Sequence, residues 1–178
     1  EETRQLSVTD PLTELPNRRY LVQHLGLELA RAYRPAIPTA TLLMDVNDFK
    51  EINDTLGHKA GDYVLREIGL VARSVLRPYD VCARFGGDEF VLVLWDCDLA
   101  QAERRRQQLE DLIGAIEVSA PGGASMRASA SIGIAVYPVD GHTTDQLLAA
   151  ADAKMYERKA SLKAVRRERA EGSEVAER

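Results

Sequence analysis

The chain has 178 residues, which suits one globular domain and is too short for two domains of ordinary size. Hydrophobic residues make up 45% and charged residues 29% of the composition, which excludes a disordered, collagen-like or membrane-spanning chain. The net charge of −5 argues against DNA or RNA as a partner, because such binding needs a basic surface, whereas a small anionic ligand needs only a few clustered cations.

Hydrophobic periodicity and turn residues predict alternating helices and strands. In chain order, the predicted elements are a helix over 17–33, a strand over 39–46, helices over 49–57 and 62–77, strands over 81–85 and 90–94, a helix over 98–116, a strand over 126–137 and a last helix from 143. Residues 164–178 are charged or small, and we expect a disordered tail there. This order predicts an α/β or α+β sheet covered by helices.

The cysteines and the N-terminus indicate where the chain functions. Cys82 and Cys97 lie in or beside apolar segments without the spacing of a zinc site, so we expect reduced core residues in a cytoplasmic protein. The N-terminus has neither the basic start nor the apolar core of a signal peptide. We expect residues 1–9 to be the end of a linker or signalling helix from an absent upstream sensory region, and any membrane anchor to lie in that region.

Three acids lie at two of the predicted turns. Asp45 ends the central strand, and Asp88 and Glu89 follow Gly86 and Gly87 at the tip of the hairpin. If the hairpin flanks the central strand, the carboxylates meet, and each close pair repels by about 4 kcal/mol unless a cation intervenes. Oxygen ligands favour Mg²⁺ or Mn²⁺ bridged to substrate phosphates. Each residue alone is typical of a turn or cap, but two consecutive acids between apolar strands favour a metal site.

The run Gly86-Gly87-Asp88-Glu89-Phe90 resembles the signature of the GGDEF domain, the diguanylate cyclase family. Further segments resemble other landmarks of this family in the same order: 10–19, with Glu14 where glycine is usual, 45–62, 131–135 and 151–159. The resemblance covers residues 10–163, which we predict to form the domain.

The resemblance implies that two GTP molecules condense to cyclic di-GMP with release of two pyrophosphates. It also implies a central, mostly antiparallel sheet of about five strands surrounded by helices, similar to the palm of nucleotide polymerases and class III nucleotide cyclases. The signature hairpin would lie at the active site, and a homodimer would bring together one GTP from each protomer.

The metal and catalytic roles carry over to five positions. Asp45, the Val46 carbonyl, Asp88 and Glu89 would hold one or two Mg²⁺ ions against the phosphates. Asp88 also matches the position assigned as base for the 3′-hydroxyl, although the metal alone could acidify that group, and both readings stay open. Lys50 would neutralise charge that develops on the phosphate.

The resemblance also assigns residues to the nucleotide. Asn53 and Asp62 would read guanine, because a carboxylate accepts from donors that adenine does not offer in that arrangement. A helix-surface Asn and a helix-capping Asp are the alternatives. Gly86 and Gly87 would admit the ligand, and Lys159, with Lys163 one helical turn later, would grip the triphosphate. A solvated basic face is the alternative for Lys163.

Two positions depart from the family pattern. Asn47 stands where a second aspartate is common, which weakens a direct metal role there without affecting Asp45. The family commonly has Gly-Arg-Asn after the matched lysine, whereas this chain has Leu162-Lys163-Ala164. The positive charge survives, but the turn and the bidentate fork of arginine are lost, so substrate affinity is less secure than catalytic competence.

Arg77-Pro78-Tyr79-Asp80 lies five residues before Gly86, the spacing of the family's product-inhibition site. An arginine fork can engage guanine or phosphate while the aspartate takes the N1 and N2 donors, so the pair suits cyclic di-GMP. A chance match beside a proline helix stop is the alternative. Any of Arg104, Arg105 and Arg106 would supply the second half of that site, and a charged helix face explains them equally.

Three hypotheses follow. The first is an active diguanylate cyclase. The second is a non-catalytic receptor that senses cyclic di-GMP through Arg77 and Asp80, which the intact signature disfavours. The third is an enzyme that uses the same metals on another nucleotide, against which Asn53 and Asp62 argue. His24, His58 and His142 are not expected to act in catalysis, and a structural hydrogen bond or cap is the better reading of His58.

Overall fold

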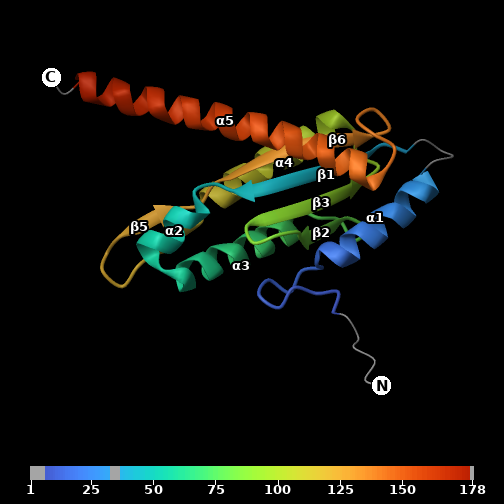
Figure 1. Cartoon of the computed structure of the whole chain (residues 1–178), viewed down its shortest axis with the longest axis horizontal. Helices are drawn as coiled ribbons and strands as arrows, with labels where there is room; N and C mark the ends of the chain where they lie inside the picture. The colour runs from blue at the N-terminus through green and yellow to red at the C-terminus, as the bar shows by residue number, and fades with distance from the viewer. Residues whose placement is uncertain (1–6, 33–36, 177–178) are drawn as a thin grey trace.

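A computed structural model describes residues 7–32 and 37–176 of the chain (Figure 1). The elements are α1 Arg18–Ala32, β1 Thr39–Val46, α2 Phe49–Leu56, α3 His58–Ser74, β2 Val81–Arg84, β3 Glu89–Trp95, α4 Leu99–Gly114, β4 Glu117–Ser119, β5 Ser125–Arg127, β6 Ala130–Tyr137 and α5 Thr144–Ala176. None of the helices in these described ranges is both long and apolar enough to cross a bilayer.

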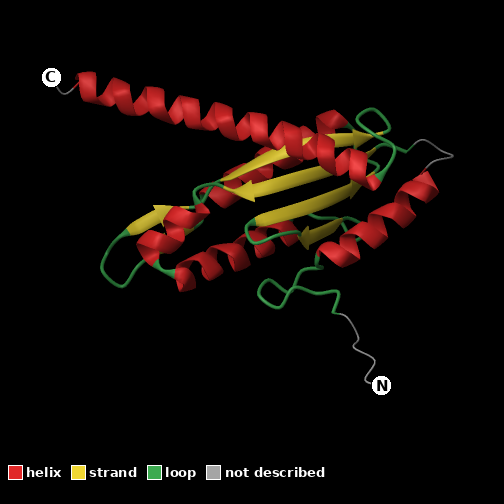
Figure 2. Ribbon diagram, viewed as in Figure 1, coloured by secondary structure: helices red, strands yellow, loops and turns green. Residues whose placement is uncertain are grey.

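The main sheet has four antiparallel strands in the order β2-β3-β1-β6 (Figure 2). β1 lies inside the sheet between β3 and β6, which explains its continuous apolar sequence. In this register Asp45 at the end of β1 faces Glu89 on β3 and Ser131 on β6. The sheet therefore presents the end of its central strand beside the turn of the β2–β3 hairpin.

Helices cover both faces of the sheet. Leu42 and Met44 belong to one core with residues of α2, α3 and α4, whereas Leu43 belongs to a second core with α1 and α5. Alternate side chains of β1 thus point into opposite layers. Gly133 on β6 allows α5 to lie close to the sheet, because a Cβ there would lie 2.0 Å from the carbonyl oxygen of Ala151.

A polar contact ties the segment before α1 to the hairpin. Arg84 Nη1 lies 3.1 Å from Asp10 Oδ1, and Arg84 Nη2 donates to the Gly87 carbonyl at 2.7 Å. Burial alone would raise the pKa of Asp10, but hydrogen bonds from Thr13 and the Arg84 charge lower it overall. Glu14 in the same segment has a φ of 59°, in the left-handed region, which gives a physical reason for a glycine at this position.

The structure refines several predictions. The strand predicted over 126–137 is two strands, β5 and β6, in different sheets, because Ala128 donates to the Ile116 carbonyl and the Ser129 carbonyl accepts from Asn47. The main sheet accordingly has four strands rather than about five, and β4 and β5 form a separate pair.

Two boundaries also differ. α3 begins at His58 after Gly57, whose φ of 89° ends α2, so it starts earlier than predicted. α5 continues to Ala176 across the segment predicted to be a disordered tail, since no glycine or proline follows Lys163 before Gly172. The predicted end of the first helix at Tyr33 and most of the predicted linker, residues 1–6, lie outside the described residues.

Candidate active site

The three acids predicted to meet come together at the end of the central strand. Asp45 on β1 is paired in register with Glu89 on β3, and the Val46 amide donates to the Asp88 carbonyl at 3.0 Å. The N–H and C=O of one strand residue point to the same side, so the Val46 carbonyl also faces the hairpin. Backbone and side-chain oxygens therefore converge on one place.

The electrostatics of this place disfavour three free carboxylates. Burial raises the pKa of Asp88 first, and the neighbouring Asp45 carboxylate raises it further. Burial likewise raises the pKa of Glu89, followed by the charges of Asp45, Asp88 and Asp152. The cluster consequently holds protons more tightly than isolated carboxylates do and would gain free energy from a cation.

Lys159 on α5 provides one positive charge. Its Nζ lies 2.5 Å from Asp45 Oδ2, while Asp45 Oδ1 is buried without a hydrogen-bond partner. An orphaned carboxylate oxygen beside two acids of raised pKa fits a divalent cation. Within residues 7–32 and 37–176, no group of three His, Cys, Asp or Glu side chains has the geometry of a metal site.

The hairpin turn is shaped around Glu89. The amides of Phe85 and Gly86 both donate to the Glu89 carbonyl, at 2.8 and 3.3 Å. A Cβ on Gly86 would lie 2.8 Å from the Glu89 carboxylate, whereas a Cβ on Gly87 would meet nothing within 4 Å. Gly86 thus leaves room for the acid itself, and Gly87 leaves the outer side of the turn open.

The proposed nucleotide residues lie on α2, α3 and α5. Asn53 packs against Gly61, where a Cβ would lie 2.0 Å from Asn53 Oδ1, so α2 and α3 approach closely next to Asp62. Asp62 lies inside α3, four residues after its first residue, which excludes the helix-capping alternative. Lys50 and Lys163 are exposed, and neither forms an ion pair within the described part of the chain.

Arg77 and Asp80 lie at a second place, before β2. The Asp80 side chain is only 1% exposed, and its oxygens accept from the amides of Arg77 at 3.0 Å and Trp95 at 3.1 Å. Arg77 Nε lies 3.9 Å from Asp80 Oδ2, and the guanidinium carbon lies 5.7 Å from the centre of the half-exposed Tyr79 ring. Asp80 therefore organises this loop, and Arg77 is the group that faces outward.

The three arginines of α4 separate into different environments. Arg106 pairs with Glu103 and Glu110, so it is committed to a contact within the chain. Arg105 donates to Gln108 on the same helix at 3.3 Å. Burial raises the pKa of the Cys97 thiol to about 11.

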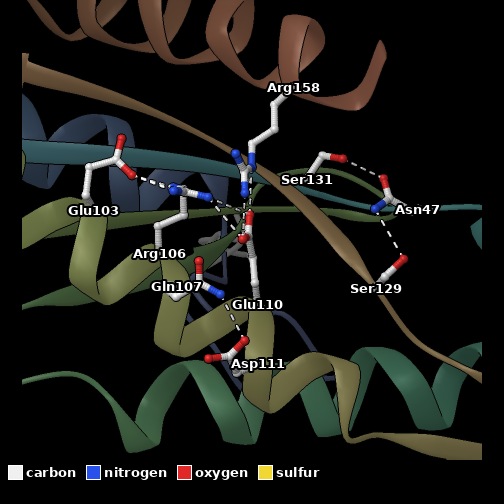
Figure 3. Close-up of polar contacts among 9 residues, drawn as sticks. All are labelled: Asn47, Glu103, Arg106, Gln107, Glu110, Asp111, Ser129, Ser131 and Arg158. Carbon is white, nitrogen blue, oxygen red and sulfur yellow. Dashed lines mark hydrogen bonds and ion pairs between the residues drawn. The ribbon is translucent and has the colours of Figure 1, made fainter. Parts of the chain in front are cut away.

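Two groups of polar contacts escaped the sequence analysis (Figure 3). Asn47 accepts from Ser131 Oγ at 2.7 Å, and its amide nitrogen lies 3.2 Å from Ser129 Oγ, so its side chain is used within the sheet. Arg158 on α5 makes two 2.8 Å contacts with Glu110 on α4. In sequence these residues look like ordinary turn and helix-surface residues, and no spacing signal links the partners.

Comparison with known proteins shows which family has this sequence and fold. The family model described as "Diguanylate cyclase, GGDEF domain" matches residues 7–164. The chain belongs to the GGDEF family. The expected resemblance and fold class are thereby confirmed, apart from the strand number corrected above.

Individual relatives are similar to this GGDEF domain in sequence or structure. The response regulator PleD from Caulobacter vibrioides is 39% identical over 162 residues, which cover 90% of this chain and 36% of PleD, so the chain spans about a third of that relative. The GGDEF domain of TpbB (or YfiN) from Pseudomonas aeruginosa is 38% identical, with a TM-score of 0.80 over 86% of this chain and 89% of that one. The GGDEF domain of DgcB from Caulobacter crescentus, in complex with c-di-GMP, is 25% identical, with a TM-score of 0.81 over 89% and 93%.

Proposed function

We propose that this domain is an active diguanylate cyclase that condenses two GTP molecules into cyclic di-GMP and two pyrophosphates. The observation that carries the proposal is the acid cluster, in which Asp45 keeps a buried oxygen without a partner beside Asp88 and Glu89. Membership of the GGDEF family and relatives named diguanylate cyclase support the same reaction.

Asp45, the Val46 carbonyl, Asp88 and Glu89 would hold Mg²⁺ or Mn²⁺. When bound, the cation supplies charge neutralisation at the α-phosphate and acidifies the attacking 3′-hydroxyl. Asp88 would also accept the 3′-hydroxyl proton, unless the bound cation alone acidifies that group. Lys50, the second residue of α2, would stabilise charge on the phosphate.

The lysines of α5 would bind the triphosphate. Lys159, whose ammonium pairs with Asp45, would bind phosphate oxygens beside the acid cluster. Lys163 lies one turn further along the same helix and would contact the end of the triphosphate. Asn53 and Asp62, next to the Gly57 and Gly61 junction, would read the guanine edge and exclude adenine.

The reaction requires two copies of the chain. One protomer offers one set of acids and one set of proposed guanine readers, whereas the product contains two guanylates, so we propose an antiparallel homodimer with one GTP per protomer. Because the reaction consumes GTP, we place the domain in the cytoplasm. We also propose that an upstream sensory or regulatory region controls it, in keeping with a relative named as a response regulator.

A separate product site would centre on Arg77 and Asp80, whose side chains lie 3.9 Å apart. The Arg77 guanidinium would engage the phosphates or guanines of cyclic di-GMP. Asp80 would act mainly by fixing the Arg77 loop, because its oxygens already accept backbone hydrogen bonds. The complex of the related DgcB domain with c-di-GMP supports a ligand of this kind.

Product identification tests the proposal. The purified protein is stripped of bound nucleotide, incubated with GTP and Mg²⁺ over a range of protein concentrations, and the products are separated by chromatography and mass spectrometry. We expect cyclic di-GMP, with a specific rate that rises with protein concentration as dimers form. No product from a folded protein at high concentration, while cyclic di-GMP still binds, would favour the receptor hypothesis instead.

A further inference from the structure

A charged cluster connects α4 to α5 (Figure 3). Its centre is the Glu110 carboxylate, which accepts from Arg158 Nε and Nη2 at 2.8 Å each and from Arg106 Nη1 at 3.1 and 3.0 Å. Arg106 also donates to Glu103 at 2.7 Å. We call these four residues the α4–α5 ion cluster.

The cluster differs from an ordinary surface ion pair. The Glu110 and Arg106 side chains are only 15% and 14% exposed, and Arg158 is about a third exposed. Two parallel N–H bonds from one guanidinium to one carboxylate fix direction as well as distance, which a lysine does not do. The Arg158–Glu110 contact therefore defines the orientation of α5 relative to α4.

Arg158 and Lys159 hold opposite flanks of the same helical turn. Consecutive residues of an α-helix are rotated by about 100°, so their side chains diverge to two sides. Arg158 reaches Glu110 on α4, while Lys159 reaches Asp45 on β1. Between these flanks, Ala151 and Met155 press against Gly133 of β6. Contacts on three sides thus set the rotation of α5 about its axis.

Other contacts near this turn are few. A groove of about 420 Å³ separates the facing sides of α4 and α5 beside Ile132 and Ile134, so the ion cluster joins helices that do not pack together there. Within residues 160–165 no hydrogen bond or ion pair reaches another element, and α5 then extends away from the rest of the domain (Figure 1). Arg158 therefore lies close to the end of the anchored part of α5.

We propose that Arg158 is a positioning residue, whose contact with Glu110 holds Lys159 at Asp45 and at the site of the triphosphate. The inference rests on the nucleotide role proposed for Lys159. A rotation of α5 by about 20° would carry a group about 6 Å from the helix axis through about 2 Å. Such a displacement is large enough to lose a contact that must align with the reacting phosphate.

Affinity for a non-hydrolysable GTP analogue with Mg²⁺, measured by calorimetry on the whole chain, tests the proposal. Arg158→Gln should weaken binding about tenfold, and Arg158→Lys, which keeps the charge but loses the fork, should fall between it and the wild type. Lys154→Gln is the matched control: Lys154 lies on the same helix as Arg158 but pairs with Asp140 in the turn after β6, so its loss should leave the affinity unchanged within about twofold. Thermal unfolding of each variant shows that it is folded.

A double-mutant cycle decides whether Arg158 acts through its neighbour. In a Lys159→Gln background, Arg158→Gln should have almost no further effect on affinity. The proposal is overturned if Arg158→Gln lowers the affinity equally in both backgrounds, or if Lys154→Gln lowers it as much as Arg158→Gln does. Either result leaves the role of Lys159 intact. Unchanged affinity for Lys159→Gln alone would overturn both the nucleotide role of Lys159 and the inference built on it.

Discussion

Asp45 and Asp80 are both shielded aspartates beside the same sheet, and they differ in how their oxygens are used. Asp80 accepts a backbone amide on each oxygen. One oxygen of Asp45 accepts from the ammonium group of Lys159, and the other has no hydrogen-bond partner. The first arrangement closes a loop, whereas the second leaves an unsatisfied acid where a ligand can bind. The number of hydrogen-bond partners therefore distinguishes the structural carboxylate of Asp80 from that of Asp45, which is available to a ligand.

The largest effect is expected on activity, for a substitution of Asp45. Asp45→Asn should reduce cyclic di-GMP formation by about 10³-fold or more, because it removes a metal-binding charge at the reacting phosphate. The fold should persist, since the like charges of Asp88 and Glu89 lose a neighbour. Initial rates and circular dichroism measure the two effects. Activity near that of the wild type would remove Asp45 from the metal site.

Asp80, whose two oxygens both have hydrogen-bond partners, should affect stability rather than activity. Asp80→Ala removes two charge-assisted hydrogen bonds and leaves the Trp95 amide unsatisfied, so we expect about 3 kcal/mol less unfolding free energy. Denaturant titration measures this loss. Arg77→Ala serves as the companion variant, which should weaken cyclic di-GMP binding with little change in stability. If Asp80→Ala is as stable as the wild type, the contrast between the two aspartates fails.

Asn47 is a position where a third aspartate can be introduced and compared with Asp45 and Asp80. Both ends of its buried amide are used, by Ser131 and Ser129, so Asn47→Asp should cost about 1 to 2 kcal/mol through a buried charge. Its side chain is turned toward β6, and Mg²⁺ affinity should not rise. Chemical denaturation with and without Mg²⁺ separates the two possibilities, and tighter metal binding would show that Asn47 reaches the acid cluster.

The smallest effect concerns pH. The pKa values of Asp88 and Glu89 are raised in the folded chain, so the folded state binds protons more tightly than the unfolded state. Without metal, the stability from these protons should be present at low pH and lost as pH rises from the ordinary carboxyl values through the raised ones. Melting temperatures in a chelator should show this decline, and Asp88→Asn should reduce it. Excess Mg²⁺ should reverse the trend, because it binds the deprotonated acids.

Sequence reasoning located the acid cluster because its signals are local. The apolar run of β1 and the glycines of the hairpin predict two elements that need only be adjacent for Asp45 to meet Glu89. Cross-chain contacts between polar residues could not be predicted in this way. Arg158 and Glu110 are 48 residues apart, and each has the periodicity of an exposed helix face. Their pairing depends on the spacing of two helices across a sheet edge.

The use of individual oxygens was equally invisible in the sequence. Asp80 matched a ligand-binding pattern, but its backbone partners include Trp95 on another strand, whose register is fixed only by the folded sheet. The length of α5 was missed for a different reason, because a charged segment without glycine or proline is compatible with both a helix and a disordered tail.

The projecting end of α5 would amplify small tilts of the helix at the active site. From Lys159 the helix continues to Ala176, a distance of about 25 Å at a rise of about 1.5 Å per residue. A tilt of about 5° at the active-site end would therefore move the tip by about 2 Å, a displacement that a pair of spin labels can resolve. Labels on the tip and on the rigid sheet would record movements of Lys159 without any probe in the nucleotide site.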